Sequence, residues 1–212
     1  MDADFSIELG RDDPVLDFPW KDPAGRFAYI DLKRQPELLA QVEEAQEFPE
    51  LGEFLRSVNS PRSLMESAKC DAWATTELSL EEDVFDASHK CASYVDLVFS
   101  NTASANTLIA STDVTNADAP TIDRRFSFPS HEKFAKRLTE LLRRAPEMPS
   151  STEVCIRRCF FGDAGETREG FYFTVYISGY GSDEITARRN WGVALKLVAN
   201  AIGQLSLSGR CE

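Results

Sequence analysis

Two neighbouring strands predicted in the first half of the sequence carry the side chains best suited to a polar binding site. The strands span residues 64–77 and 92–100, and the side chains of an extended chain point alternately to its two faces. If the strands pair, one shared face carries a lysine, two carboxylates and two aromatic rings, namely Lys69, Asp71, Trp73, Tyr94 and Asp96. Such a group could bind a small polar ligand or serve an enzyme. The alternative is an ion pair that Trp73 shields from water.

The patterns that usually accompany catalysis or cofactor binding are incomplete. His89 and His131 are the only histidines, and His131 has no second histidine at the spacing of a zinc motif. The turn Gly179-Tyr180-Gly181 lies between a predicted strand and a predicted helix, but it lacks the third glycine of a nucleotide-binding loop. The carboxylates of Asp183 and Glu184 at the helix start would repel a phosphate. We therefore predict no catalytic residue, no metal site and no cofactor, and we favour a protein that is not an enzyme.

Cysteine use and hydropathy favour the cytoplasm. The five cysteines are an odd number without metal-ligand spacing. Cys155 and Cys159 would lie about 13 Å apart along one predicted strand, too far for a disulfide, so reduced thiols are expected. Residues 1–5 lack the basic and apolar regions of a signal peptide, and no apolar run is long enough to span a membrane. We expect a soluble cytoplasmic protein.

The net charge of −12 lies entirely in the first part of the chain. Residues 1–90 contain 21 Asp and Glu against 9 Lys and Arg, whereas the remaining residues contain 14 of each kind. An acidic surface repels nucleic acid and anionic membranes and attracts a basic protein partner. The residues expected to contact such a partner lie on predicted helices and in an acidic linker; they are Glu43, Glu44, Glu47, Glu50, Glu81, Glu82 and Asp83. The alternative is a solvated acidic surface that keeps the protein soluble.

Four pairs of adjacent arginines occur in the second part of the chain, at 124–125, 143–144, 157–158 and 188–189. Adjacent side chains diverge in both strands and helices, so the pairs do not form one basic patch by themselves. We interpret them as ion-pairing partners of the acidic residues, with an anion or RNA site as the alternative.

The stretch 152–205 organises the predicted fold. Strands are predicted over 154–161 and 171–178, on either side of a polar, glycine-rich loop. A helix follows in which apolar residues recur at helical spacing from Ala187 to Leu205, and this stripe must be buried against the sheet. Earlier elements are a strand over 26–33, helical pieces that begin at Pro36 and after Pro49, the two strands named above, and a helix from Ser130.

We expect an α+β fold in which helices pack mainly on one face of an antiparallel sheet. The order of the first six elements is the ferredoxin-like split pattern, followed by an extra C-terminal strand and a long helix. Residues 1–25 are predicted to be an arm packed on the body, and 26–212 a single domain in which 26–101 and 124–206 are two candidate related halves. An alternative order omits the strand at 26–33 and adds one at Leu108-Ile109. That order is similar to acidic secretion-chaperone-like folds.

The function expected from the sequence is that of an acidic protein interaction module, chaperone-like, immunity-like or adaptor-like, that binds a basic partner through its N-terminal part. A small-molecule-binding domain or enzyme with a site near Lys69, Asp71 and Trp73 is the alternative. Homo-oligomerisation through an exposed apolar face of the sheet is a third hypothesis.

Overall fold

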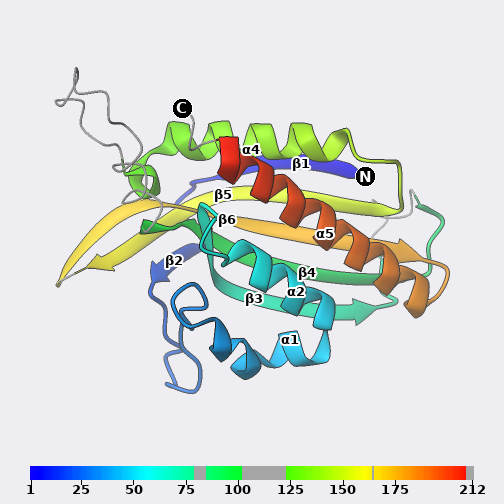
Figure 1. Ribbon diagram of the computed structural model, residues 1–212, viewed down its shortest axis with the longest axis horizontal. Helices are drawn as coiled ribbons and strands as arrows, with labels where there is room; N and C mark the ends of the chain where they lie inside the picture. The colour runs from blue at the N-terminus through cyan, green and yellow to red at the C-terminus, as the bar shows by residue number, and fades with distance from the viewer. Residues whose placement is uncertain (79–84, 102–122, 164, 209–212) are drawn as a thin grey trace.

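Six strands form one sheet, and helices lie across one of its faces (Figure 1). The computed structural model describes residues 1–78, 85–101, 123–163 and 165–208. The strand order is β1 (Asp2–Glu8), β5 (Ser150–Asp163), β6 (Glu166–Gly181), β4 (His89–Phe99) and β3 (Met65–Thr75), and β2 (Val15–Phe18) pairs with the later part of β5. β1 and β2 run parallel to β5, and the other neighbours are antiparallel. The predicted α+β class is therefore confirmed, but the prediction of an antiparallel sheet is wrong, because two N-terminal strands join β5 in parallel and make the sheet mixed.

The central hairpin of β5 and β6 and the helix that covers it form as predicted. Val154 pairs with Val175 and Ile156 with Phe173, and these side chains belong to the main core beneath α5 (Glu184–Ser208). Trp191 of α5 is fully buried in that core. A Cβ atom on Gly179 would lie 2.0 Å from the backbone nitrogen of Trp191. Only glycine therefore allows the helix to cross β6 so closely.

Proline and serine residues set where the other helices begin. The chain after β2 forms η1 (Pro36–Gln41), α1 (Glu43–Glu47) and α2 (Pro49–Val58), and proline occupies the first position of η1 and of α2. Later, η3 (Arg124–Phe126) precedes α4 (Phe128–Arg143). The Ser127 hydroxyl accepts a hydrogen bond from the amide of Ser130 and caps α4. The helices α2, α4 and α5 bury their apolar sides in one core against the sheet.

The predicted strand at 26–33 does not form. Apart from an isolated bridge between Lys21 and Ala28, this segment runs irregularly. Its alternating aromatic and aliphatic residues serve packing instead, since Tyr29 contacts Phe18 and Leu32 is buried in the main core. The ferredoxin-like split order required a strand here and is not confirmed. Leu108 and Ile109, which the alternative order required, lie outside the described residues.

Residues 1–25, expected to be an arm, supply both β1 and β2 to the sheet. The main core accordingly extends in sequence from Met1 to Leu205. The relation between residues 26–101 and 124–206 as two halves stays a prediction. No helix within the described ranges combines the length and the apolar character that a membrane span requires.

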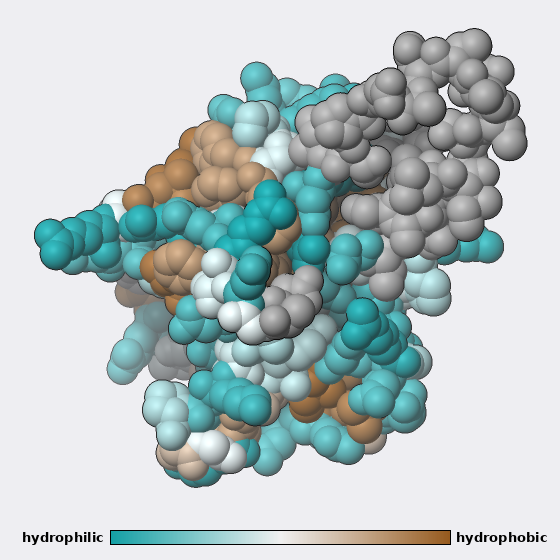
Figure 2. Space-filling view, turned by 90° about the vertical axis from the view of Figure 1, so that its left-hand side faces the viewer, coloured by the Kyte–Doolittle hydropathy of each residue, from teal (hydrophilic) through white to brown (hydrophobic). Residues whose placement is uncertain are grey.

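The sheet face opposite α2, α4 and α5, here called the open face, carries no α-helix in the described part of the chain. At one end it holds a second, smaller apolar cluster formed by Leu16, Ala68, Val98, Cys159, Phe161 and Tyr172. Phe18, Trp20 and Phe126 pack against this cluster. Figure 2 shows the molecule from the left-hand side of Figure 1, where a largely hydrophilic surface is broken by separate hydrophobic patches.

Candidate functional site

The five residues nominated from the sequence share the open face. In the pairing of β3 with β4, Lys69 lies opposite Asp96 and Asp71 lies opposite Tyr94, with Trp73 two residues further along β3. Their surroundings differ, because Trp73 is 38% exposed whereas Asp96 is only 7% exposed. The five side chains therefore lie on one face of the sheet, but some are exposed to solvent and others are buried. Their role in binding a ligand stays a prediction.

Asp96 belongs to a polar network that crosses four strands. The Thr174 hydroxyl on β6 donates to Oδ1 of Asp96 at 2.6 Å, and Arg157 on β5 donates to the same hydroxyl at 2.9 Å. Arg157 also forms an ion pair with Glu8 on β1, with an N–O distance of 2.6 Å. Burial raises the pKa of Asp96 to about 6, although the Thr174 hydrogen bond, Lys69 and Arg157 oppose the rise. Since these partners satisfy one another, the network is structural and not an open site.

A groove of about 790 Å³ follows the outer edge of β3. Its walls come from the irregular segment 20–32, from residues 41–44 and from β3 itself. Lys69, Asp71 and Tyr94 of the nominated group line it, whereas Trp73 and Asp96 do not. We call this concave site the edge groove.

Side chains satisfy the outward-facing backbone groups at the start of β3, whereas further along the strand these groups are available to a new partner. Nζ of Lys33 donates to the carbonyl of Met65 at 2.7 Å, and the indole of Trp20 donates to the carbonyl of Ala68. The amide of Ala72 instead donates to Oδ1 of the adjacent Asp71 at 2.8 Å, a contact within the strand. β3 is the last strand of the sheet, so its outer edge beyond Ala68 has no partner strand among the described residues.

Some acidic residues of the first part are already paired inside the molecule. Glu50 forms an ion pair with Arg188 at 2.9 Å, which lowers the pKa of Glu50, and Glu53 lies 3.4 Å from Lys196. Glu43, Glu44 and Glu47 make no ion pair with any described residue, and the first two line the edge groove. The remaining nominated acids, Glu81, Glu82 and Asp83, lie outside the described residues. Fewer acidic side chains of the first part are therefore available to a partner than the net charge of the chain suggests.

The edge groove has a negative electrostatic character. Burial raises the pKa of the Cys70 thiol to about 12, and the carboxylates of Glu44, Asp71 and Asp96 add to the rise. Two of the basic residues in the groove are engaged, since Arg26 pairs with Asp22 at 3.4 Å and the Lys69 ammonium lies 5.6 Å from the centre of the Trp20 ring. The carboxylates of Glu43, Glu44 and Asp71 thus face the groove without ion-pair partners in the described chain.

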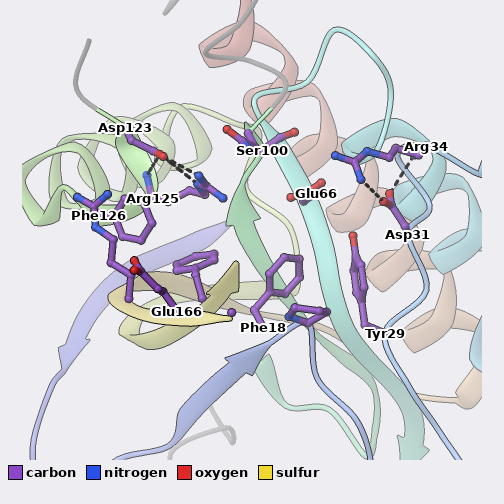
Figure 3. A pocket seen from close by; sticks show the side chains of 15 residues that line it. Phe18, Tyr29, Asp31, Arg34, Glu66, Ser100, Asp123, Arg125, Phe126 and Glu166 are labelled. Carbon is purple, nitrogen blue, oxygen red and sulfur yellow. Dashed lines mark hydrogen bonds and ion pairs between the residues drawn. The ribbon is translucent and has the colours of Figure 1, made fainter. Parts of the chain in front are cut away.

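The second concave site is a cleft of about 550 Å³ where segment 18–34, the start of β3, η3 and the β5–β6 hairpin meet (Figure 3). We call it the Glu66 cleft. Glu66 lies on β3 between Arg125 on one side and Tyr29 and Asp31 on the other (Figure 3). Gly170 allows η3 to approach the hairpin, because a Cβ atom there would lie 2.5 Å from the carbonyl oxygen of Arg125.

Some charged groups of the Glu66 cleft have ion-pair partners and others do not. Arg125 pairs with Asp123 at 2.7 Å, and Arg34 lies 3.7 Å from Asp31. The Glu66 carboxylate makes no hydrogen bond or ion pair with any described residue. Burial and then Asp31 raise its pKa to about 7, and Lys33, Arg34 and Arg125 oppose the rise. Burial, Glu66 and Asp31 also raise the pKa of the Tyr29 phenol.

Among the residues that the structure describes, one group of side chains could in principle ligate a metal. Ligand atoms of Glu8, Glu153 and Cys155 lie within 4.8 Å of one another. Glu8 is occupied by Arg157, and burial raises the pKa of the Cys155 thiol to about 12. A protonated thiol beside an occupied carboxylate is a poor ligand set, so we assign no metal to this group.

Glu66 and the residues around it form a site that was not predicted from the sequence. Glu66 lies only three positions before Lys69, but the other residues that line its cleft come from segments far apart in the chain, including the segment wrongly predicted as a strand. One available signal was a carboxylate on a predicted strand face next to the small residue Ala68. No protein-family model, curated protein or solved structure matches this chain, so its function must be argued from this geometry.

Proposed function

We propose that the protein is an acidic interaction module that receives an extended, basic peptide segment of a partner protein in the edge groove. The observation that carries the proposal is that the unpaired edge of β3 begins inside the groove, at Cys70 and Asp71, where carboxylates line the walls. The backbone of the partner would pair with β3, and its basic side chains would meet Glu43, Glu44 and Asp71.

The shape of β3 supports an added strand. Cys70, Ala72 and Ala74 alternate along the face of β3 on which Cys70 and Ala72 pack against the main core, and none of the three is large enough to cover the strand edge. The amide of Ala72 is bonded only to the neighbouring Asp71 carboxylate among the contacts described for this edge, and that carboxylate can swing to a lysine or arginine of the peptide. The peptide would thus replace a local contact with backbone and charged partners.

Charge supports a basic partner over an acidic one. The groove carboxylates without ion-pair partners outnumber the basic groups that remain unengaged there, and the whole chain carries −12. Rim charges of this kind act mainly on the association rate and on the choice of partner. Because Glu43 and Asp71 are exposed and Glu44 is partly exposed, salt should weaken the attraction.

The test uses a synthetic decapeptide of alternating lysine and valine, with a glutamate–valine peptide of equal length for comparison. Binding is followed by fluorescence anisotropy at about 0.05 M and about 0.5 M salt, where the screening length falls from more than 10 Å to less than 5 Å. We expect binding of the lysine peptide only, weakened by added salt. Glu43→Gln with Glu44→Gln should weaken it about fivefold, as expected for two rim charges worth about 1 kcal/mol together.

A matched control removes the same charge elsewhere. Glu132→Gln with Glu140→Gln alters two exposed positions on α4 and should leave binding unchanged. Strand addition is tested by N-methylating alternate peptide residues, since only one of the two alternating sets can donate to the edge of β3. Equal loss for both sets, or equal binding of the glutamate peptide, would contradict the proposal.

A further inference from the structure

We propose that the Glu66 cleft is a second, separate binding site, and that it takes a small organic cation consisting of an ammonium group on an aromatic body. This inference goes beyond the peptide site, which lies along the edge of β3. Tyr29 lines both sites, so the experiment must tell them apart.

The acidic floor of the cleft provides the recognition of charge. Glu66 reaches the cleft from β3 and has no hydrogen-bonding partner among the described residues, although most of its surface is buried. Tyr29 and Asp31 lie next to it, and Figure 3 shows these side chains facing the same space. A buried carboxylate without a partner is costly, and an ammonium group placed there would satisfy it.

Aromatic rings form the part of the cleft that would hold the body of the ligand. Phe18 lies 4.7 Å from Tyr29 and 5.7 Å from Phe161 between ring centres, and Phe126 lies 5.4 Å from Phe161. All four rings line the cleft. A volume of about 550 Å³ falls within the range typical of small-molecule sites. Rings arranged in this way favour a flat apolar group and also stabilise a nearby cation.

The arginines of the cleft do not favour an anion. Arg125 is held by Asp123 at 2.7 Å and lies 5.5 Å from the centre of the Phe161 ring. Arg34 pairs with Asp31, and Arg168 lies over the Phe126 ring at 3.7 Å. An anion would have to displace these contacts in order to bind the arginines. A cation can instead pair with the Glu66 carboxylate, which has no ion-pair partner among the described residues.

Protonation offers a further measurement on the same group. The pKa of Glu66 is raised to about 7 by burial and by Asp31, while Lys33, Arg34 and Arg125 act against the rise. A bound ammonium group would lower this pKa, so binding near neutral pH should release a proton from Glu66. A ligand that binds elsewhere in the molecule would not do so.

The experiment compares three probes that share one skeleton and differ in charge, namely phenethylammonium, 2-phenylethanol and phenylacetate. Their binding to the full chain is measured by chemical-shift titration at about pH 8, where Glu66 is ionised. We expect phenethylammonium to bind at least about tenfold more tightly than the other two. Phenylacetate binding as tightly as phenethylammonium would overturn the proposal, whatever the behaviour of any variant.

Two glutamine variants locate the site. Glu66→Gln should weaken phenethylammonium binding about tenfold or more, while Glu44→Gln in the edge groove should leave it unchanged. Calorimetry of the unmodified chain in two buffers of different ionisation heat should show proton release near pH 7 that Glu66→Gln abolishes. If Glu44→Gln lost phenethylammonium binding and Glu66→Gln kept it, the assignment of this ligand to the Glu66 cleft would be refuted. That result would not decide the peptide site, which is tested separately by binding of the lysine–valine peptide.

Discussion

Replacing Asp96 by asparagine should make the protein more stable than the unmodified chain, by an amount that grows with pH. Asparagine keeps the shape of the side chain and an oxygen that can accept the hydrogen bond from Thr174, which lies 2.6 Å away. It removes the ionisable carboxyl group from a site that is 7% exposed. The change therefore isolates the free energy of ionising Asp96 in the interior.

The size of the effect follows from the pKa of Asp96, which burial raises from its usual 3.8 to about 6. In the unfolded chain the group ionises near 3.8, so the folded protein binds more protons between the two values and loses stability as pH rises through them. The loss approaches about 3 kcal/mol above the folded pKa and is only about 0.5 kcal/mol near pH 4. The advantage of the asparagine variant should accordingly increase by about 2.5 kcal/mol over this range.

The assay is urea unfolding of both proteins at several pH values between about 4 and 7.5, with the difference in unfolding free energy plotted against pH. The difference must be used because His131 acts in the opposite direction. Burial lowers the pKa of His131 to about 4 in the folded protein. The neutral imidazole therefore contributes stability at pH values above the pKa of histidine in the unfolded chain, and this contribution is lost as the pH falls. A difference between variant and parent that stays flat across the range would refute the account of Asp96.

Three further predictions concern packing, the Glu66 cleft and the thiols. Gly179→Ala on β6 should cost about 3 kcal/mol or more in thermal or urea unfolding, because the added Cβ meets the backbone of Trp191. Gly203→Ala within α5 has open space around the added Cβ and should instead gain about 0.5–1 kcal/mol. Glu66→Gln should raise the unfolding free energy at about pH 8 by up to about 3 kcal/mol and have little effect near pH 4, since the pKa of Glu66 is raised to about 7. Burial raises the pKa of Cys91 and Cys155 to about 12, so mass-spectrometric mapping after a thiol reagent should find both unmodified until the chain unfolds.

The regular elements could be predicted because their patterns are long and local. The alternation from Val154 to Phe161 and the helical repeat from Ala187 to Leu205 each specify one buried face, and both elements form. The sheet order could not be predicted, because pairing β1 and β2 with β5 joins residues about 150 positions apart. Nothing in Phe5 or Leu16 indicates which strand each will join.

The group of polar residues on β3 and β4 could likewise be predicted only where it depends on local sequence patterns. Lys69, Asp71, Tyr94 and Asp96 share a face because two strands alternate in register, and this required no knowledge of the fold beyond their pairing. The sequence could not show that Asp96 would be closed in by Thr174 and Arg157, since that depends on how β4, β5 and β6 are ordered. Asp96 is therefore a less suitable ligand contact than Asp71, which stays exposed beside the edge groove.

The segment from Phe18 to Arg34 explains why the Glu66 cleft was not predicted from the sequence and why the edge groove was predicted only in part. Its alternating residues resemble a strand, but Tyr29 packs on Phe18 and Leu32 enters the main core, so the backbone wraps β3 without pairing along it. A wrapping segment leaves gaps on both sides, which are the edge groove and the Glu66 cleft, whereas a paired strand would have closed the edge of β3. The local pattern and the observed conformation disagree here, and disagreement of this kind is expected at functional or strained sites.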